Sequence, residues 1–312
     1  MLKIEKNNQS SPLHKPVLIA EILNILQNYN HKTYIDATFG AGGYTKQILK
    51  NTNCKIIAFD RDPSVISIAN EVQNQFGTRF QFIHDKFSNI PQYVDKIDGI
   101  IADFGISSMQ IDNYDRGFSF NKEAKLNMQM GKCEITAFDV INSFSEKELA
   151  DIIFKYSNER LACKIASMIY TERKKNTIFT TTHLASIIYE AYNKPNHYKI
   201  HPATKTFQAI RIFVNKELDE IESLLENSSK IINQNGILAC VSFHELEDRI
   251  VKQFFEKNSE KKIKKNKYSQ KIITDNTHSF EVITKKPIEP SEYEIKENPR
   301  SRSAKLRIGK RI

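Results

Sequence analysis

The sequence predicts an α/β fold built on a doubly wound, mostly parallel sheet, and three observations support this prediction. Short apolar segments alternate with segments of helical spacing between residues 33 and 104. The first apolar segment runs into a glycine-rich turn at residues 40–43, and the second ends on Asp60, twenty residues after Gly40. A strand, a glycine turn, a helix and a second strand ending in an acid make up a nucleoside-binding half-fold, in which the acid accepts hydrogen bonds from the ribose hydroxyls.

The expected elements alternate along the first third of the chain. A helix over residues 17–27 follows Pro16, because its apolar positions repeat at helical spacing. Helices are expected to start at Thr45 and Pro63, and strands are expected over 33–39, 54–59, 79–84 and 99–104. This alternation predicts parallel strands joined by right-handed crossovers.

A long insertion separates the fourth strand from the fifth, which is expected over residues 236–243. The gap is about 130 residues, whereas a crossover needs a dozen or so. Its middle is typical of three helices, over 145–156, 158–175 and 182–192. One helix from Thr204 to about Ile232 is expected to lead back to the fifth strand. Segments over 278–284 and 303–309 are expected to complete a seven-stranded sheet.

Composition excludes several classes of protein. The chain has 312 residues, 40% of them hydrophobic, yet no apolar stretch approaches the roughly 20 residues of a membrane span. The N-terminus lacks the apolar core of a signal peptide, and the cysteines are scattered, so we expect reduced thiols in a cytoplasmic protein. His197 and His201 are followed by Pro202 and have no third ligand nearby, so no metal site is expected. The four cysteines are Cys54, Cys133, Cys163 and Cys240.

The net charge of +9 lies entirely in the last sixth of the chain. Residues 257–312 hold 16 Lys+Arg against 7 Asp+Glu, which leaves 30 against 30 before them. The lysine-rich run at 257–268 is also compatible with a solvated loop. The arginines between residues 298 and 311 point more firmly to a polyanion, so a nucleic-acid substrate is expected.

Two departures from the dinucleotide pattern indicate which nucleotide-like ligand binds. Thr45 stands where the third glycine would be, and Asp36 at the tip of the first strand would repel a pyrophosphate. A ligand with an ammonium group and no phosphate is favoured, and S-adenosylmethionine fits. A dinucleotide-dependent oxidoreductase is the alternative, and the missing glycine argues against it.

The strand ends carry the expected chemistry, because ligands of open α/β sheets bind there. Asp103 ends the fourth strand and is followed by a polar loop at 105–108. Methylation of pyrimidine C5 requires a cysteine nucleophile, and neither Cys133 nor Cys240 lies in a suitable loop. An exocyclic amine needs only alignment and an acceptor, which Asp103 or a neighbouring carbonyl supplies, on a base taken out of its stack. His244, at the tip of the fifth strand, is a second catalytic candidate.

Several motifs together resemble the RsmH/MraW family. They are DATFGAGG at 36–43, DFGISSMQID at 103–112, RGFSF at 116–120, residues 201–218, residues 242–252 and NPRSRSAKL at 298–306. The family comprises S-adenosylmethionine-dependent methyltransferases that modify cytosine N4 of 16S ribosomal RNA. The resemblance implies a Rossmann-like class I methyltransferase domain over 1–108 and 201–312. It also implies an inserted helical substrate-recognition domain over 109–200, and a target cytidine in the decoding centre of the small ribosomal subunit.

Site residues follow from the motifs and the strand tips. The expected cofactor contacts are Asp36, Gly42, Gly43, Tyr44, Asp60, Phe87, Asp103 and Gln110. The expected substrate contacts are Arg116, Lys205, Gln208, Arg211, Asn215, Asp248, Arg300 and Arg302. Tyr44 replaces the family's histidine, so its contact is expected through the backbone. Asn127 and Gln129 stand where the family has an ion pair, and an amide pair is expected between them.

Other functions stay open at this point. A DNA amino-methyltransferase is the nearest alternative enzyme, but the [DNS]-P-P-[YF] loop is absent at Asp103. A noncatalytic RNA-binding assembly factor on the same fold would bind cofactor without methyl transfer. The sequence leaves the oligomeric state open, a homodimer included, along with the assembly stage of the ribosomal substrate.

Overall fold

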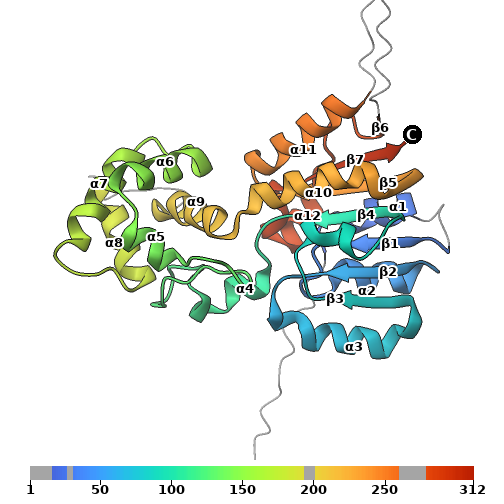
Figure 1. The fold of residues 1–312 in the computed structure, drawn as a ribbon, viewed down its shortest axis with the longest axis horizontal. Coiled ribbons are helices and arrows are strands. Elements are labelled where there is room, and N and C mark those ends of the chain that lie inside the picture. The colour runs from blue at the N-terminus through green and yellow to red at the C-terminus, as the bar shows by residue number, and fades with distance from the viewer. Residues whose placement is uncertain (1–15, 27–30, 193–200, 260–278) are drawn as a thin grey trace, which may run out of the picture.

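The computed structural model describes residues 16–26, 31–192, 201–259 and 279–312, which form a sheet-containing part and a separate helical part (Figure 1). The basic run at 257–268 therefore lies outside the described residues from residue 260 on, and His197 also lies outside them. In the part of the chain that the structure describes, no helix is long and apolar enough to cross a membrane.

The sheet has seven strands in the order β3-β2-β1-β4-β5-β7-β6. Strands β1 to β5 are parallel, whereas β7 runs antiparallel to both β5 and β6. Strand order reverses between β1 and β4, which places a ligand-binding crevice at their carboxyl ends. The strands are β1 Thr33–Asp36, β2 Lys55–Phe59, β3 Phe80–Ile83, β4 Ile97–Asp103, β5 Ile232–Ser242, β6 Phe280–Val282 and β7 Lys305–Arg311.

Helices cover both faces of this sheet, as expected for a doubly wound fold. Side chains of neighbouring strand residues point to opposite faces, so Tyr34 packs with α1 to α3 whereas Ile35 packs with α10 and α11. Both residues are at most 1% exposed. The helices of this part are α1 Ile19–Leu26, α2 Gly43–Asn51, α3 Ile66–Phe76, α10 Glu217–Ile231, α11 Glu245–Asn258 and α12 Glu292–Glu297.

The chain between β4 and α10 forms the helical part, which has a core of its own. Leu149, Ile165, Ile188 and Ile210 are fully buried in this core. Its helices are α4 Ser108–Asp112, α5 Ala137–Ser143, α6 Glu146–Ser157, α7 Ala162–Arg173, α8 Thr181–Ala191 and α9 Ala203–Asn215. Helix α9 packs into this second core although it follows residue 200, where the inserted domain was predicted to end. The domain boundaries therefore stay a prediction.

Two helix predictions differ from the structure, and left-handed residues explain both. The helix expected from Thr204 to Ile232 is wrong as a single element, because Lys216 adopts φ +51° and separates α9 from α10. The helix expected from residue 158 begins at Ala162 instead, since Asn158 adopts φ +50° as the C-cap of α6. Asparagine is one of the few non-glycine residues enriched in this conformation, whereas a lysine gives no sequence signal for it.

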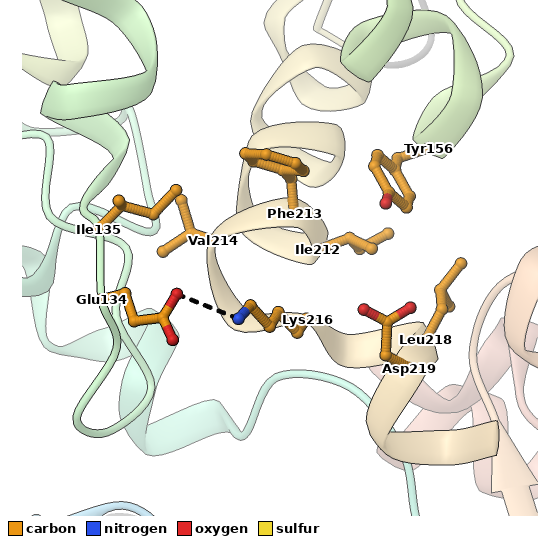
Figure 2. A pocket seen from close by; sticks show the side chains of 9 residues that line it. All are labelled: Glu134, Ile135, Tyr156, Ile212, Phe213, Val214, Lys216, Leu218 and Asp219. Atoms are coloured by element: carbon orange, nitrogen blue, oxygen red, sulfur yellow. Dashed lines mark hydrogen bonds and ion pairs between the residues drawn. The ribbon is translucent and has the colours of Figure 1, made fainter. Parts of the chain in front are cut away.

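A small cavity of about 130 Å³ lies beside the break at Lys216 (Figure 2). Ile212, Phe213 and Tyr156 form its apolar side. Lys216 Nζ pairs with Glu134 Oε2 at 3.1 Å, and both side chains are largely exposed to solvent. This ion pair joins two segments of the helical part, the loop before α5 and the end of α9.

Candidate active site

A cavity of about 630 Å³ opens at the carboxyl ends of β1, β2, β4 and β5, between the sheet and the start of the helical part. Many sequence-predicted site residues line this cavity: Gly43, Tyr44, Asp60, Phe87, Asp103, Gln110, Arg211, His244, Arg300 and Arg302. Its wall also includes Arg61 and Glu247, which sequence reasoning did not assign to the site. The reversal of strand order therefore gathers distant segments around one space.

The glycine turn forms one wall because its backbone adopts conformations that glycine favours. Gly40 and Gly42 have φ values of +52° and +73°, and Gly42 caps the N-terminus of α2. A Cβ on Gly42 would lie 2.9 Å from the Phe39 ring, so the turn has no room for a larger residue there. Gly42 therefore shapes the turn but does not line the cavity, and its predicted contact with the cofactor stays a prediction.

Asp60 lies on the cavity wall and is held by the backbone around it. Its Oδ2 accepts a hydrogen bond from Gly40 N at 2.8 Å, and its Oδ1 accepts one from Asp62 N at 2.9 Å. Burial and the nearby charge of Asp62 raise the pKa of Asp60 despite these bonds. The acid after β2 and the glycine turn after β1 thus form one rigid unit.

Asp36 lies behind the glycine turn and is fully buried. Its Oδ2 accepts a hydrogen bond from Thr45 Oγ1 at 2.6 Å, and its Oδ1 accepts one from Thr38 N at 3.2 Å. Burial raises the pKa of Asp36 to about 6. Asp36 does not line the cavity, so the structure places it in support of the turn.

In the part of the chain that the structure describes, Asp103 has a carboxylate oxygen that lacks a hydrogen-bond partner. Its Oδ1 is buried and has no hydrogen-bond partner, although the carboxylate borders the cavity. Its backbone N–H donates to Thr38 Oγ1 at 2.7 Å, which fixes the end of β4 against β1. Burial, together with the negative charges of Asp36 and Glu247, raises the pKa of Asp103 well above its ordinary value. A ligand that brings a positive charge or a donor would satisfy this oxygen.

Glu247 borders the same cavity as Asp103 and is fully buried. Its Oε2 accepts hydrogen bonds from Phe243 N at 2.8 Å and His244 N at 3.3 Å. Its Oε1 lies 2.9 Å from His244 Nε2, without the alignment that a hydrogen bond requires, and 3.5 Å from where a Cβ on Gly105 would be. Burial opposes its ionisation, but these contacts with His244 and Phe243 hold the pKa of Glu247 below its ordinary value.

His244 is the N-cap of α11 and contacts Glu247 through both ring nitrogens. Its Nδ1 accepts a hydrogen bond from Glu247 N at 3.4 Å, and its Nε2 lies beside the Glu247 carboxylate. Sequence reasoning interpreted the first-turn acids only as partners of the helix dipole. The available signal was the spacing of His244 and Glu247, which is that of a capping box and which the structure forms.

Several predicted substrate contacts are occupied by partners within the protein. Asn215 is 1% exposed and bonds the backbone of Met128 and Met130, so it is not accessible to RNA in this structure. Arg211 forms a two-bond ion pair with Glu217, at 2.8 and 3.0 Å. Asp248 is paired with Arg307 at 2.7 Å and with Lys305 at 3.7 Å.

The remaining predicted substrate contacts differ in their placement. Arg116 pairs with the buried Asp62, away from the cavity wall. Arg300 borders the cavity and pairs with Asp112 at 2.9 Å, and both side chains are exposed. Arg302 borders the cavity and is exposed. Lys205 is exposed and Gln208 half-buried on α9, and neither lines the cavity.

Comparison with known proteins identifies the family of this chain. The model of the MraW methylase family matches residues 11–312. The chain belongs to the MraW methylase family. The ribosomal RNA small subunit methyltransferase H of Orientia tsutsugamushi (strain Ikeda) is 48% identical over 307 residues, covering 96% of this chain and 98% of that protein. The protein of the same name from Rickettsia canadensis (strain McKiel) is 46% identical over 304 residues, with the same coverage.

Membership of this family confirms the predicted class of enzyme. The protein is a methyltransferase with a class I sheet, and its methyl donor is S-adenosylmethionine. The cavity fits this donor, because Asp60 and Asp103 border it and the buried Oδ1 of Asp103 has no hydrogen-bond partner among the described residues. The unpartnered oxygen of Asp103 and the raised pKa values of Asp36, Asp60 and Asp103 all indicate a site that a positive charge would stabilise.

The two departures from the family pattern have local explanations. Tyr44 is buried and donates its hydroxyl to Val17 O at 2.5 Å, so its side chain serves the fold. The predicted side-chain amide pair is wrong in detail: Asn127 Oδ1 accepts from the backbone N of Gln129 at 2.8 Å. The Gln129 amide instead donates to the carbonyls of Cys133 and Ile135.

Proposed function

We propose that the protein transfers a methyl group to the exocyclic N4 amine of a cytidine in the decoding centre of 16S ribosomal RNA. The curated relatives are named as small subunit ribosomal RNA methyltransferases, which supports ribosomal RNA as the substrate. The choice of an exocyclic amine rests on the site itself. We further propose that the protein works in the cytoplasm, where its ribosomal substrate would be made.

One observation carries the proposal: the buried, unpartnered Oδ1 of Asp103 at the cavity. An amine nucleophile develops positive charge as it forms its bond to the methyl carbon, and a nearby carboxylate stabilises that charge. Asp103 and Glu247 border the same cavity, and the negative charge of Glu247 acts on Asp103. This arrangement needs no covalent catalyst.

The cysteines support an amine target over a ring carbon. Cys54 and Cys240 are buried, and burial raises the pKa of Cys240 far above its ordinary value. Neither Cys133 nor Cys163 lines the cavity. A C5 methyltransferase would need a thiolate at the base, and these placements do not provide one.

The residues of the chain divide the work of binding and alignment. Asp60 would hold the ribose hydroxyls of the donor, and the backbone of the glycine turn at 40–43 would pack against the donor. The bound donor supplies an electrophilic methyl group on a positively charged sulfur. Asp103 orients the N4 lone pair of the substrate and stabilises the charge that grows on nitrogen.

One proton must leave the substrate for the reaction to balance. The N4 lone pair forms the new N–C bond, the C–S bond breaks with its electrons going to sulfur, and one N4 proton then departs. Asp103 accepts that proton or passes it to water at the cavity mouth, since its raised pKa makes it a competent acceptor once ionised.

Nucleoside analysis tests the proposed product. Purified protein is incubated with isotope-labelled S-adenosylmethionine and with 16S ribosomal RNA or small subunits from cells that lack the gene. The RNA is then digested and its nucleosides identified by mass spectrometry. We expect label in N4-methylcytidine at one position of the decoding centre. Label in a C5- or O-methylated nucleoside, or cofactor binding without any methyl transfer, would contradict the proposal.

A further inference from the structure

The three residues that follow β2, Asp60-Arg61-Asp62, contact both the cofactor cavity and the helical part. Asp60 and Arg61 border the cavity. Arg61 also reaches the helical part, where its Nη1 donates to Asn215 O at 2.9 Å and its Nη2 lies 3.1 Å from Met130 Sδ. The segment thus touches two parts of the molecule that are far apart in sequence.

Asp62 is the centre of these contacts, although it is only 1% exposed and does not line the cavity. On the cofactor side, its backbone N–H donates to Asp60 Oδ1 at 2.9 Å. Its Oδ2 accepts from Nε2 of Gln110, which borders the cavity, at 2.7 Å, and pairs with Arg116 Nη1 of the helical part. Burial opposes its charge, yet these hydrogen bonds hold the pKa of Asp62 below its ordinary value.

Arg116 continues the connection into the helical part. Its Nη2 donates to Gln129 O at 2.7 Å and to Met130 O at 3.0 Å. Met130 N in turn donates to Asn215 Oδ1 at 2.8 Å. Because Arg61 donates to Asn215 O, the contacts form a closed circuit that begins and ends in the segment after β2.

The segment after β2 and the helical part are closely packed against each other along this circuit. A Cβ placed on Gly131 would lie 2.3 Å from Arg61 O, so the backbone of the helical part is pressed against the segment after β2. A movement of the segment that holds Asp60 would therefore displace residues 127–131 as well. Asp62 and Arg116 supply the charged contact in this interface.

We infer that Asp62 and Arg116 are positioning residues that couple occupancy of the cofactor cavity to the placement of the helical part. The inference rests on the proposed RNA substrate, which the helical part would help to hold. It also reassigns Arg116, expected from sequence to contact RNA. Coupling of this kind is reciprocal, so cofactor and RNA should each strengthen the binding of the other.

The test compares the affinity for S-adenosylhomocysteine with and without a saturating 16S ribosomal RNA transcript, measured by calorimetry at fixed salt. In the wild-type protein the RNA should raise this affinity by about fivefold or more, the lower end of typical coupling. Asp62→Asn keeps the size of the side chain and removes its charge. Arg116→Lys keeps the charge but loses the planar fork that bridges Asp62 and two carbonyls. In each variant, the RNA should change the affinity for S-adenosylhomocysteine by less than about twofold.

Glu134→Gln is the matched control, since it also removes an ion pair, but one that lies within the helical part (Figure 2). Glu134 pairs with Lys216 and has no contact with the segment after β2, so this variant should keep the wild-type RNA effect. Wild-type protein that binds the RNA without any change in cofactor affinity would overturn the inference. So would full coupling in folded Asp62→Asn or Arg116→Lys protein. Failure of the wild-type protein to bind the RNA at all would instead contradict the proposed function.

Discussion

At the scale of single residues, the site is defined by carboxylates whose neighbours are negative. Asp36 and Asp103 are held at strand ends where burial penalises their charge. Their hydrogen bonds to Thr45 and Thr38 fix their positions without cancelling that penalty. A cationic donor would relieve it, which links cofactor binding to the protonation state of these groups.

The pH dependence of stability tests this view for Asp36. Its folded pKa of about 6 lies above the ordinary 3.8, so the folded state holds the proton more tightly than the unfolded chain does. The contribution of Asp36 to the stability of the cofactor-free protein should therefore fall as pH rises from about 4 to 6, and the penalty should be complete above 6. Asp36→Asn should raise the free energy of unfolding at pH 8 by on the order of 2–3 kcal/mol, and by little at pH 4. Denaturant unfolding at both pH values measures this, and an equal change at both would contradict it.

Asp60 provides a second prediction at this scale. Asp60→Ala removes a charge-assisted hydrogen-bond acceptor for the ribose, which should cost on the order of 1.5–3 kcal/mol, or about ten- to hundredfold in affinity for S-adenosylmethionine. Calorimetry on protein that retains a cooperative thermal transition measures the loss. Unchanged affinity in the folded variant would remove the ribose assignment.

At the scale of elements, the arginines near the C-terminus divide into two groups. Arg307 and Arg311 lie on β7 and bond to Asp248 and to the carbonyls of Ser229 and Ser279, so they hold the sheet together. Arg300 and Arg302 lie just before β7, at the cavity, and are exposed. From the sequence, all of these arginines were expected to bind a polyanion. In the structure, only Arg300 and Arg302 among them are placed where they can contact a nucleic acid.

This division predicts different effects on RNA binding. Neutralising Arg302 should lower the slope of log affinity for RNA against log salt by roughly one, as expected for one lost phosphate contact. Arg307→Gln should instead lower the melting temperature, because it leaves Asp248 with a weaker partner. Filter binding across a salt series and thermal unfolding separate the two. An unchanged slope for Arg302→Gln would mean that this side chain does not contact RNA.

At the scale of the whole molecule, the sequence predicted the sheet well because strand tips, glycines and apolar periodicity are local signals. The seven-stranded, mostly parallel sheet and the place of Asp60 and Asp103 at strand ends followed from them, whereas the order of the strands was not predicted. The break at Lys216 did not, since nothing in a lysine marks a left-handed residue. Glu247 and Asp62 were missed for a related reason. Their importance depends on contacts with residues more than forty positions away, or on burial that a first-turn acid rarely has.

The noncovalent mechanism also concerns the molecule as a whole. Replacement of all four cysteines by serine or alanine should leave methyl transfer intact, because none lines the cavity in the described part of the chain. Two of the four are buried, so thermal unfolding must confirm that the variant is folded. Loss of turnover from a single cysteine replacement, with normal stability and cofactor binding, would point to a covalent route and against an amine target.

The most direct test of the account is single-turnover methylation by Asp103→Asn with saturating cofactor. The substitution keeps the shape of the side chain and removes the charge that would align and stabilise the amine. We expect the rate of methyl transfer to fall by at least about a hundredfold while RNA affinity changes little. A rate near that of the wild-type protein would show that a backbone carbonyl accepts the amine and that Asp103 serves only the fold.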